Sequence, residues 1–217
     1  MILNKLNASL ELILYDPLSY IHPERMYLPE QFDTPRKRGI VNDMLIRQLK
    51  LPVGLGFSTS AHERHLVLNW RRLAYISTLI GAQLLKSDLA WQGDLLHLPD
   101  SVRFFLTLQI CNTAPSRRKA RMTFQEVQRF GLQHLLLWQR HASEPLTKRM
   151  ALLFPPTFDK FFLEQYSSTW TSAAVHLFSP SEYRSEHASE YASEVRQADL
   201  SLILQAIQYA KNNPNNV

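Results

Sequence analysis

Two histidines and a carboxylate lie close together in the sequence, at His62, Glu63 and His65, and they are the first residues to consider for metal chemistry. Imidazole and carboxylate groups are common zinc ligands, and a spacing of three puts His62 and His65 on neighbouring positions of one helical face. However, zinc-protease helices use a spacing of four, and neither a cysteine nor a third histidine accompanies this pair. Exposed histidines in a polar first helical turn are commoner, so we expect no metal and no other cofactor.

A glycine-containing stretch could in principle bind phosphate. Gly54-Leu55-Gly56, followed by Ser58 and Thr59, resembles the start of a phosphate-binding loop. It lacks the remaining glycine and the lysine of such loops, and it follows no predicted strand. We therefore interpret it as a loop that precedes a helix.

A basic loop at residues 116–121 could contact the phosphates of a nucleic acid. Its cationic residues are Arg117, Arg118, Lys119 and Arg121. No aromatic residues are interleaved with them, and no second basic stripe follows on a helix, whereas nucleic-acid-binding surfaces usually combine such features. A solvated loop is the preferred interpretation, and nucleic-acid binding through residues 116–121 remains the alternative function.

The chain shows no set of residues suited to nucleophilic catalysis. No serine lies in a nucleophile elbow, and Cys111 has no basic partner nearby in the sequence that would favour a thiolate. We therefore expect no enzymatic activity. A single cysteine also cannot form an intrachain disulfide, which fits a reducing compartment, and we expect a cytoplasmic location.

Two stretches remain as candidates for binding a protein partner. Prolines and aromatic residues alternate over residues 15–28, and an adjacent arginine pair follows Trp70. A bent, rigid backbone loses little entropy on docking, and Tyr and Arg dominate many interfaces. The predicted partner-binding residues are Pro17, Tyr20, His22, Pro23, Arg25, Arg71 and Arg72. The alternative interpretation is structural, with Trp70 in the core, both arginines solvated, and the tyrosines and prolines pinning the N-terminal segment.

These residues must be positioned by helices, of which the longest predicted one covers residues 60–91. Ser60 and Glu63 have capping-box spacing at its start, and apolar residues recur at three- and four-residue steps, including Leu73, Ile80 and Leu84. The uncharged stretch between Arg72 and Lys86 is too short to span a bilayer of about 30 Å. We therefore predict a buried central helix.

Shorter helices are predicted around it. One covers residues 3–15 and stops at Pro17, and another covers residues 40–51 with Val41, Met44, Leu45 and Leu49 facing inward. A second capping box, Thr123 with Glu126, starts a helix in the second half of the chain. Two short helices flank Pro155-Pro156, and a last helix covers about residues 188–211.

The predicted fold is therefore mainly α, an irregular multi-helix domain around the central helix. A chain of 217 residues with 45% apolar composition can bury one substantial core, so we expect a single domain over residues 1–217. Residues 167–190 are the least globular part, either an insertion with its own role or a surface excursion. A net charge of +5, spread along the chain, does not require a nucleic-acid partner.

Several stretches together resemble the SctK (OrgA/MxiK) family of type III secretion proteins, and most closely its OrgA-type members. The resemblance rests on blocks in the same order along the chain, which are YDPLSYIHPER at residues 15–25, WRRL at 70–73, SDLA at 87–90 with LPD at 98–100, LLFPP at 152–156 and QAIQYA at 205–210. No counterpart can be placed for residues 167–190.

The resemblance implies a mainly helical, non-enzymatic adaptor of the sorting platform. Members of this family link the cytoplasmic domain of the inner-membrane ring protein to the pod protein of that platform. The implied location is cytoplasmic, at the cytoplasmic face of the inner membrane and held there through partners only. The resemblance does not assign either partner to a face of the protein.

Overall fold

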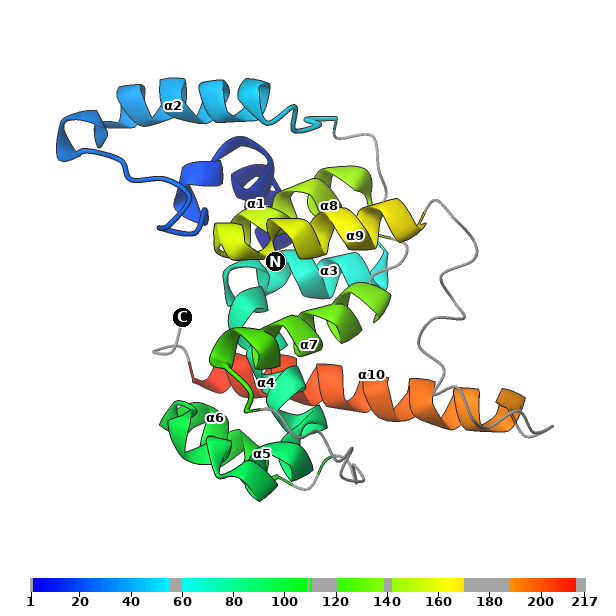
Figure 1. The fold of residues 1–217 in the computed structure, drawn as a ribbon. Helices are drawn as coiled ribbons and strands as arrows, with labels where there is room; N and C mark the ends of the chain where they lie inside the picture. The colour runs from blue at the N-terminus through cyan, green and yellow to red at the C-terminus, as the bar shows by residue number, and fades with distance from the viewer. Residues whose placement is uncertain are drawn as a thin grey trace. The chain divides into compact units, whose positions relative to one another are not determined.

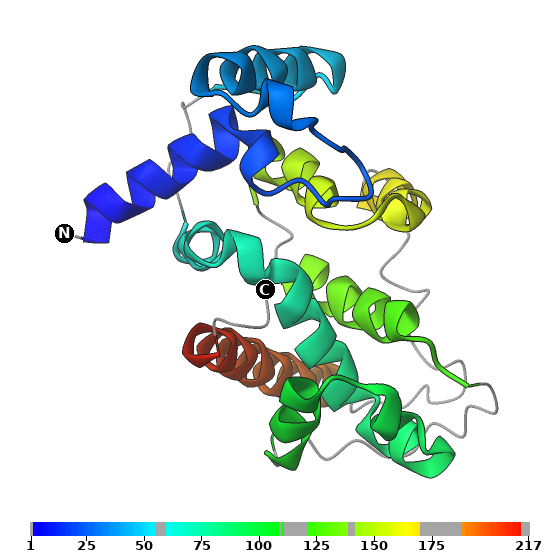
Figure 2. The ribbon, with the colours of Figure 1, turned by 90° about the vertical axis from the view of Figure 1, so that its left-hand side faces the viewer.

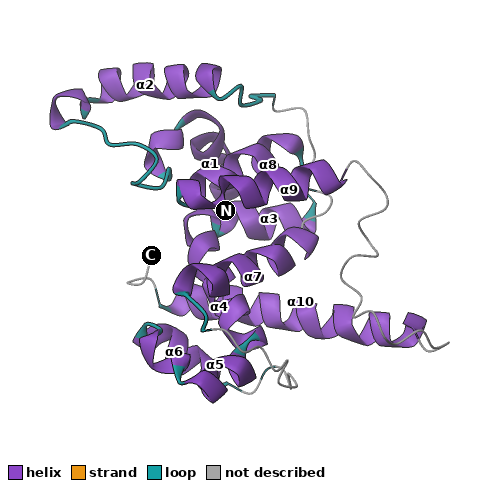
Figure 3. Cartoon of the chain, viewed as in Figure 1, coloured by secondary structure: helices purple, strands orange, loops and turns teal. Residues whose placement is uncertain are grey.

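Helices provide the regular structure throughout the described residues. The computed structural model describes residues 2–54, 60–108, 110, 121–138, 142–169 and 188–213, and within these ranges no strand occurs (Figures 1 and 3). The mainly helical fold class is confirmed. None of the helices in these ranges is both long and apolar enough to cross a membrane.

The chain divides into two compact units. Unit 1 comprises Met1–Trp70 and His141–Tyr183, and unit 2 comprises Arg71–Arg140 and Arg184–Val217. The single-domain organisation expected from the sequence stays a prediction. Most of residues 167–190 lies outside the described residues, so the structure gives no information about a surface insertion there.

Among the described residues, unit 1 contains three α-helices from its first chain segment and two from its second. They are α1 (Ile2–Tyr15), α2 (Pro35–Gln48), α3 (Ala61–Leu68), α8 (Glu144–Met150) and α9 (Asp159–Thr169). Helix α1 packs against α3 and α8 and places Leu6, Ile13 and Leu14 in the core. After α8, two 3-10 turns (Ala151–Leu153 and Pro156–Phe158) lead into α9, as the two prolines predict.

Unit 2 is built around α4 (Leu73–Leu84). The other helices of this unit are α5 (Lys86–Gln92), α6 (Asp100–Thr107), α7 (Phe124–Trp138) and α10 (Ala188–Asn212). Residues 76–83 of α4 are all buried, which no amphipathic surface helix would show, because α6, α7 and α10 all pack against α4. Leu73 and Ile80 are fully buried as predicted, Ile76 is also fully buried, and Leu84 is half-buried.

The predicted central helix at residues 60–91 is helical along its length, but it is not continuous. It consists of α3, a 3-10 turn at Trp70–Arg72, α4 and α5. The first interruption lies at Asn69, whose backbone N–H bonds the Leu66 carbonyl, three residues back, and whose side-chain amide donates to His65 O at 2.6 Å. Asparagine side chains compete with the backbone in this way, which locally tightens the helix.

The closest helix contact in unit 2 is between α4 and α7, and it depends on two glycines. A methyl group added to Gly131 would overlap the carbonyl oxygen of Ser77, and one added to Gly81 would overlap that of Val127. Gln128, also on α7, donates from its side-chain amide to Ala74 O at 3.1 Å. The two backbones therefore approach closely because neither glycine has a side chain.

The predicted helix at residues 40–51 is present but begins earlier, and the prediction of its inward face is partly wrong. Helix α2 begins at Pro35, a residue favoured in the first helical turn, and Met44 and Leu49 are exposed. The buried residue is Asn42, whose side chain accepts from Leu18 N and donates to Asp16. Met44 follows Asn42 by two residues, about 200° around the helix, and therefore faces outward.

We predict that Gly131→Ala will destabilise unit 2 by about 1–3 kcal/mol, because the added methyl group forces α4 and α7 apart. Thermal unfolding of the full chain measures the effect. Gly39→Ala on α2 is the control: nothing lies within 4 Å of the added atom, and alanine should stabilise the helix by up to about 1 kcal/mol. Equal melting temperatures for Gly131→Ala and the wild type would contradict the close helix contact.

Candidate partner-binding surface

The proline-bent segment begins where α1 ends, and its first role is to satisfy the end of that helix. Pro17 stops α1, which leaves carbonyl groups of the last turn without helical partners. Tyr20 donates its hydroxyl to Ile13 O at 2.8 Å, and Arg149 donates to Leu14 O at 2.9 Å. Both side chains come from outside α1, so the helix end is capped by tertiary structure.

Arg149 is fully buried, and its guanidinium bonds several backbone carbonyls. Its guanidinium donates to Pro52 O at 2.7 Å and Pro145 O at 3.1 Å in addition to Leu14 O, and so joins three parts of unit 1. Burial lowers the pKa of Arg149, but an arginine keeps its charge at any ordinary pH. Burial disfavours the charged form of Tyr20 as well and therefore raises its pKa, so the hydroxyl stays protonated and remains a donor.

The middle and the end of the segment are also pinned. The backbone N–H of His22 donates to Leu152 O at 2.8 Å. Arg25 donates to Phe154 O at 2.5 Å and to Pro155 O at 3.2 Å, and it forms an ion pair with Asp159. The Arg25 side chain is only 13% exposed. The segment is therefore an ordered wrap held against the Pro155-Pro156 corner.

These contacts separate the predicted partner-binding residues of this segment. Pro17 and Tyr20 are buried, and the Tyr20 ring lies edge-on to Trp70 with ring centroids 5.7 Å apart. His22 and Arg25 are partly exposed, and Pro23 is exposed. Pro17, Tyr20 and Arg25 thus have structural roles in unit 1. Partner contact stays a prediction for the whole set, and Pro23 is the residue most accessible to a partner.

The arginine pair lies where one unit meets the next along the chain. Trp70 is buried, Arg71 is exposed and Arg72 is half-buried, because successive residues of this 3-10 turn point in directions about 120° apart. Arg71 is therefore the accessible member of the pair, and its role in partner binding stays a prediction.

The histidines considered for metal binding flank a capping residue. Ser60 and Glu63 form the predicted capping box: Ser60 N donates to the Glu63 carboxylate at 2.8 Å, and Glu63 N donates to Ser60 Oγ at 3.2 Å. The same carboxylate accepts from Ser143 N at 2.8 Å, at the start of α8. Among the described residues, no group of three or more His, Cys, Asp or Glu is placed to hold a metal ion.

The environment of Glu63 changes its acidity. Burial would raise the pKa of Glu63, but hydrogen bonds from the backbone and side chains of Ser60 and Ser143 together lower it below the ordinary 4.5. The ionised carboxylate is therefore the form that joins the N-terminal ends of α3 and α8, where the helix dipoles also favour negative charge.

The other sequence candidates lie mostly outside the described residues. Of the basic loop at 116–121, only Arg121 is described, and it is exposed. Residues 55–59 of the glycine-containing loop are likewise outside the description.

Exposed apolar side chains reveal surface residues that the sequence analysis did not select. In unit 1, Tyr27 is 81% exposed, and Ile40 and Met44 on α2 are 55% and 61% exposed. In unit 2, Trp91 on α5 is 88% exposed, and Leu96 and Phe104 on the following elements are also exposed. Large exposed apolar residues of this kind are typical of protein-interaction sites when they gather on one surface. Helical periodicity alone assigns apolar residues to the core, so it cannot indicate which of them lie on the surface.

Comparisons with known proteins identify similar sequences. Residues 10–212 match a family described as "Bacterial type III secretion apparatus protein (OrgA_MxiK)". The chain is 31% identical over 213 residues to the "Oxygen-regulated invasion protein OrgA" of Salmonella typhimurium strains 14028s, SL1344 and LT2, an alignment that covers 94% of this chain and 88% of the relative. No solved structure matches.

We predict that Tyr20→Phe and Arg25→Ala will lower the melting temperature, because each removes a donor from a buried or half-buried backbone carbonyl, at a cost of about 1–3 kcal/mol. Pro23→Ser and Arg71→Glu change exposed side chains and should leave it within about 0.5 kcal/mol of the wild type. Unchanged stability in the first two variants would show that their hydrogen bonds do not hold the segment.

A second prediction concerns pH. Because the folded-state pKa of Glu63 is lowered, its ionised form contributes stability that is present above about pH 4.5 and lost as the pH falls through the folded value. Glu63→Gln should therefore lose about 1–2 kcal/mol at pH 7, and the difference from the wild type should shrink below pH 4.5. Urea unfolding at several pH values measures this.

Glu126→Gln is the matched control, because Glu126 forms the equivalent capping box on α7 but is exposed to solvent. The stability that Glu126→Gln loses at pH 7 should be smaller than the loss in Glu63→Gln. A Glu63→Gln penalty that is the same at pH 3 and pH 7 would contradict the role assigned to the carboxylate charge.

Proposed function

The chain belongs to the bacterial type III secretion apparatus family OrgA_MxiK, and we propose that within this apparatus it is a non-enzymatic adaptor. In this proposal it links the cytoplasmic domain of the inner-membrane ring protein to the pod protein of the sorting platform. It acts in the cytoplasm, at the cytoplasmic face of the inner membrane, and is held there through its partners.

Family membership makes the chain a component of a type III secretion apparatus, which implies contact with other proteins of that apparatus. The family match extends over residues 10–212 and therefore involves both compact units. This is the observation that carries the proposal, because it assigns the whole chain, and not one segment, to the apparatus.

The division into two units supports a linking role. Each unit has its own buried core and its own exposed apolar side chains, Tyr27, Ile40 and Met44 on unit 1 and Trp91, Leu96 and Phe104 on unit 2. An adaptor must contact two different proteins at once, and separate surfaces on separate units allow this. Exposed Trp is common among the residues that dominate protein interfaces.

The alternative, nucleic-acid binding through the loop at 116–121, makes a different prediction. Affinity for DNA or RNA would fall steeply with salt, because bound phosphates release counterions, and it would depend on Arg117, Arg118, Lys119 and Arg121. Salt-dependent binding that is lost on neutralising these residues would favour the alternative.

We predict that the full chain, tagged and produced in a strain with a type III secretion apparatus, co-purifies with both the ring protein and the pod protein. A variant with Trp91→Ser and Phe104→Ser should lose about tenfold or more in affinity for one of the two, because hot-spot residues cost about 2 kcal/mol or more on truncation. Its melting temperature should not change, since both side chains are exposed.

The proposal fails if the wild-type chain retains neither protein, or retains only one of them under conditions in which both are present. If the variant keeps full affinity for both proteins, unit 2 contacts its partner elsewhere and the surface assigned to it is wrong. A lower melting temperature would mean that Trp91 and Phe104 stabilise the fold.

A further inference from the structure

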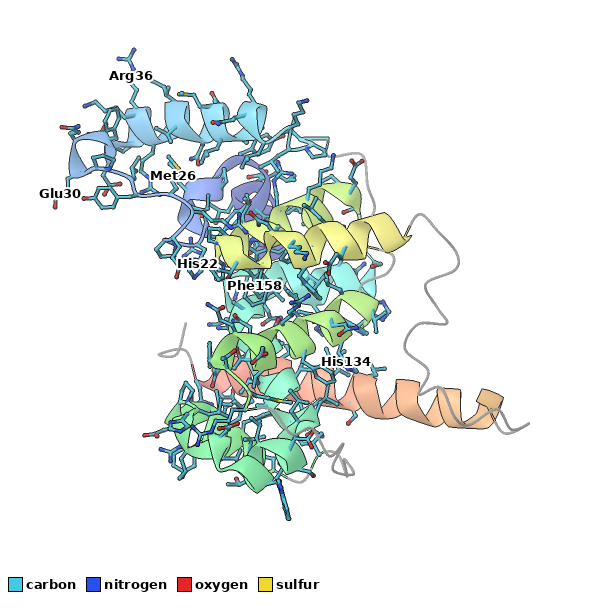
Figure 4. The ribbon with its side chains drawn as sticks, in the orientation of Figure 1. His22, Met26, Glu30, Arg36, His134 and Phe158 are labelled. Carbon is cyan, nitrogen blue, oxygen red and sulfur yellow. The ribbon has the colours of Figure 1, made fainter. Side chains whose placement is uncertain are left out.

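Helix α2 has an outer surface that its own unit does not cover. We define the outer face of α2 by two apolar residues, Ile40 and Met44, and two arginines, Arg36 and Arg47. All four are exposed. At 100° per residue they lie within about 80° of one another around the helix, on the side opposite the buried Asn42. Figure 4 shows Arg36 projecting from α2 away from the rest of unit 1, and Figure 2 shows α2 above the C-terminal end of α1, which it crosses.

This helix also holds an unusual share of the charge of the protein. Residues 35–48 contain four basic residues and one acidic residue, so the helix carries a net charge of three against five for the whole chain. Two of these bases have partners within unit 1: Arg38 pairs with Asp33 at 2.7 Å, and Lys37 bonds Gln31 O and lies over the Phe32 ring. The side chains of Arg36 and Arg47 form neither an ion pair nor a hydrogen bond with any described residue.

The composition of the outer face distinguishes between partners. A lipid surface would require a broad apolar face, usually with Trp, Phe or Leu, whereas this face has two aliphatic side chains and no aromatic one. A nucleic acid would favour a continuous row of basic side chains without apolar residues at its centre. In a symmetric pair of copies, the arginines of one face would approach those of the other and repel them. Met and Arg are enriched in protein interfaces, which leaves a protein of opposite charge.

We propose that the outer face of α2 docks into an apolar groove with an acidic rim on another protein of the secretion apparatus. Ile40 and Met44, one helical turn apart, are the apolar anchors in this groove. Arg36 and Arg47 pair with carboxylates on its rim, and these must lie roughly 16 Å apart along the groove, since eleven residues separate the arginines. This inference rests on the proposed adaptor function and specifies the chemistry of one of its partners.

The test places a photo-reactive benzoylphenylalanine at position 44 of the full chain, in cells that produce the apparatus. The expected product is a cross-link to another apparatus protein, mapped by mass spectrometry to a groove whose rim carries Asp or Glu. Arg36→Glu combined with Arg47→Glu should reduce the yield about tenfold, because like charges then meet across the interface. The corresponding neutral variant, Arg36→Gln with Arg47→Gln, should give an intermediate yield.

Lys160→Glu with Lys211→Glu is the matched control, because it reverses two other exposed bases and should leave the yield unchanged. Reversing the mapped carboxylates to lysine should restore the cross-link to the Arg36→Glu, Arg47→Glu variant. All variants are compared by thermal unfolding, and the exposed positions should leave the melting temperature unchanged.

A cross-link to phospholipid, nucleic acid or a second copy of the chain would overturn the proposal, as would a groove without acidic residues or a yield that charge reversal does not change. Failure of this inference is distinct from failure of the adaptor function. If only the inference is wrong, the α2 variants still co-purify with both apparatus proteins. If the adaptor function is wrong, the wild-type chain retains neither protein or only one of them.

Discussion

The structure of unit 1 depends on how the C-terminal end of α1 is satisfied. A helix that stops at a proline leaves carbonyl groups with no helical partner, and here they are buried, so donors must come from elsewhere. Arg149 supplies one donor to Leu14 and also bonds Pro52 and Pro145. Tyr20 supplies another to Ile13. A guanidinium can serve three carbonyls at once because its donors point in fixed, separate directions. This one buried side chain therefore connects α1, the loop after α2 and the start of α8.

Unit 2 relies on a different constraint, the close approach of two helix backbones. Gly81 on α4 and Gly131 on α7 face each other, and the packing leaves no room for a side chain at either position. Around this contact, Gln83 donates to Leu108 O at the end of α6, and Tyr209 of α10 donates to Ser101 O. Both units thus have interiors fixed by specific contacts, while Met44 and Trp91 remain exposed. Well-packed interiors with apolar residues on the surface support the proposed adaptor role, because a preorganised surface loses little entropy when it binds another protein.

Local signals predicted much of this fold. Both capping boxes, at Ser60 and at Thr123, and the breaks at Pro17 and Pro155 are properties of a few neighbouring residues, and the structure confirms them. The errors arose where tertiary contacts decide. The helical period places Met44 in the core, but Asn42 bonds Leu18 and Asp16 and so turns its own side of α2 inward, which leaves Met44 on the outer side. The two facing glycines are fifty residues apart in the sequence, and no local pattern pairs them. Tyr20 and Arg25 are residue types common in interfaces. Only their hydrogen bonds to the carbonyls of Ile13 and Phe154 reveal a structural role.

In the proposed adaptor role, this chain holds two apparatus proteins at the same time. The most direct test is to mix the purified full chain with the cytoplasmic domain of the ring protein and with the pod protein, and to measure the masses of the complexes in solution. We expect a ternary complex, in which each partner binds as tightly in the presence of the other as it does alone. Competition between the two partners, so that only binary complexes form, would contradict it.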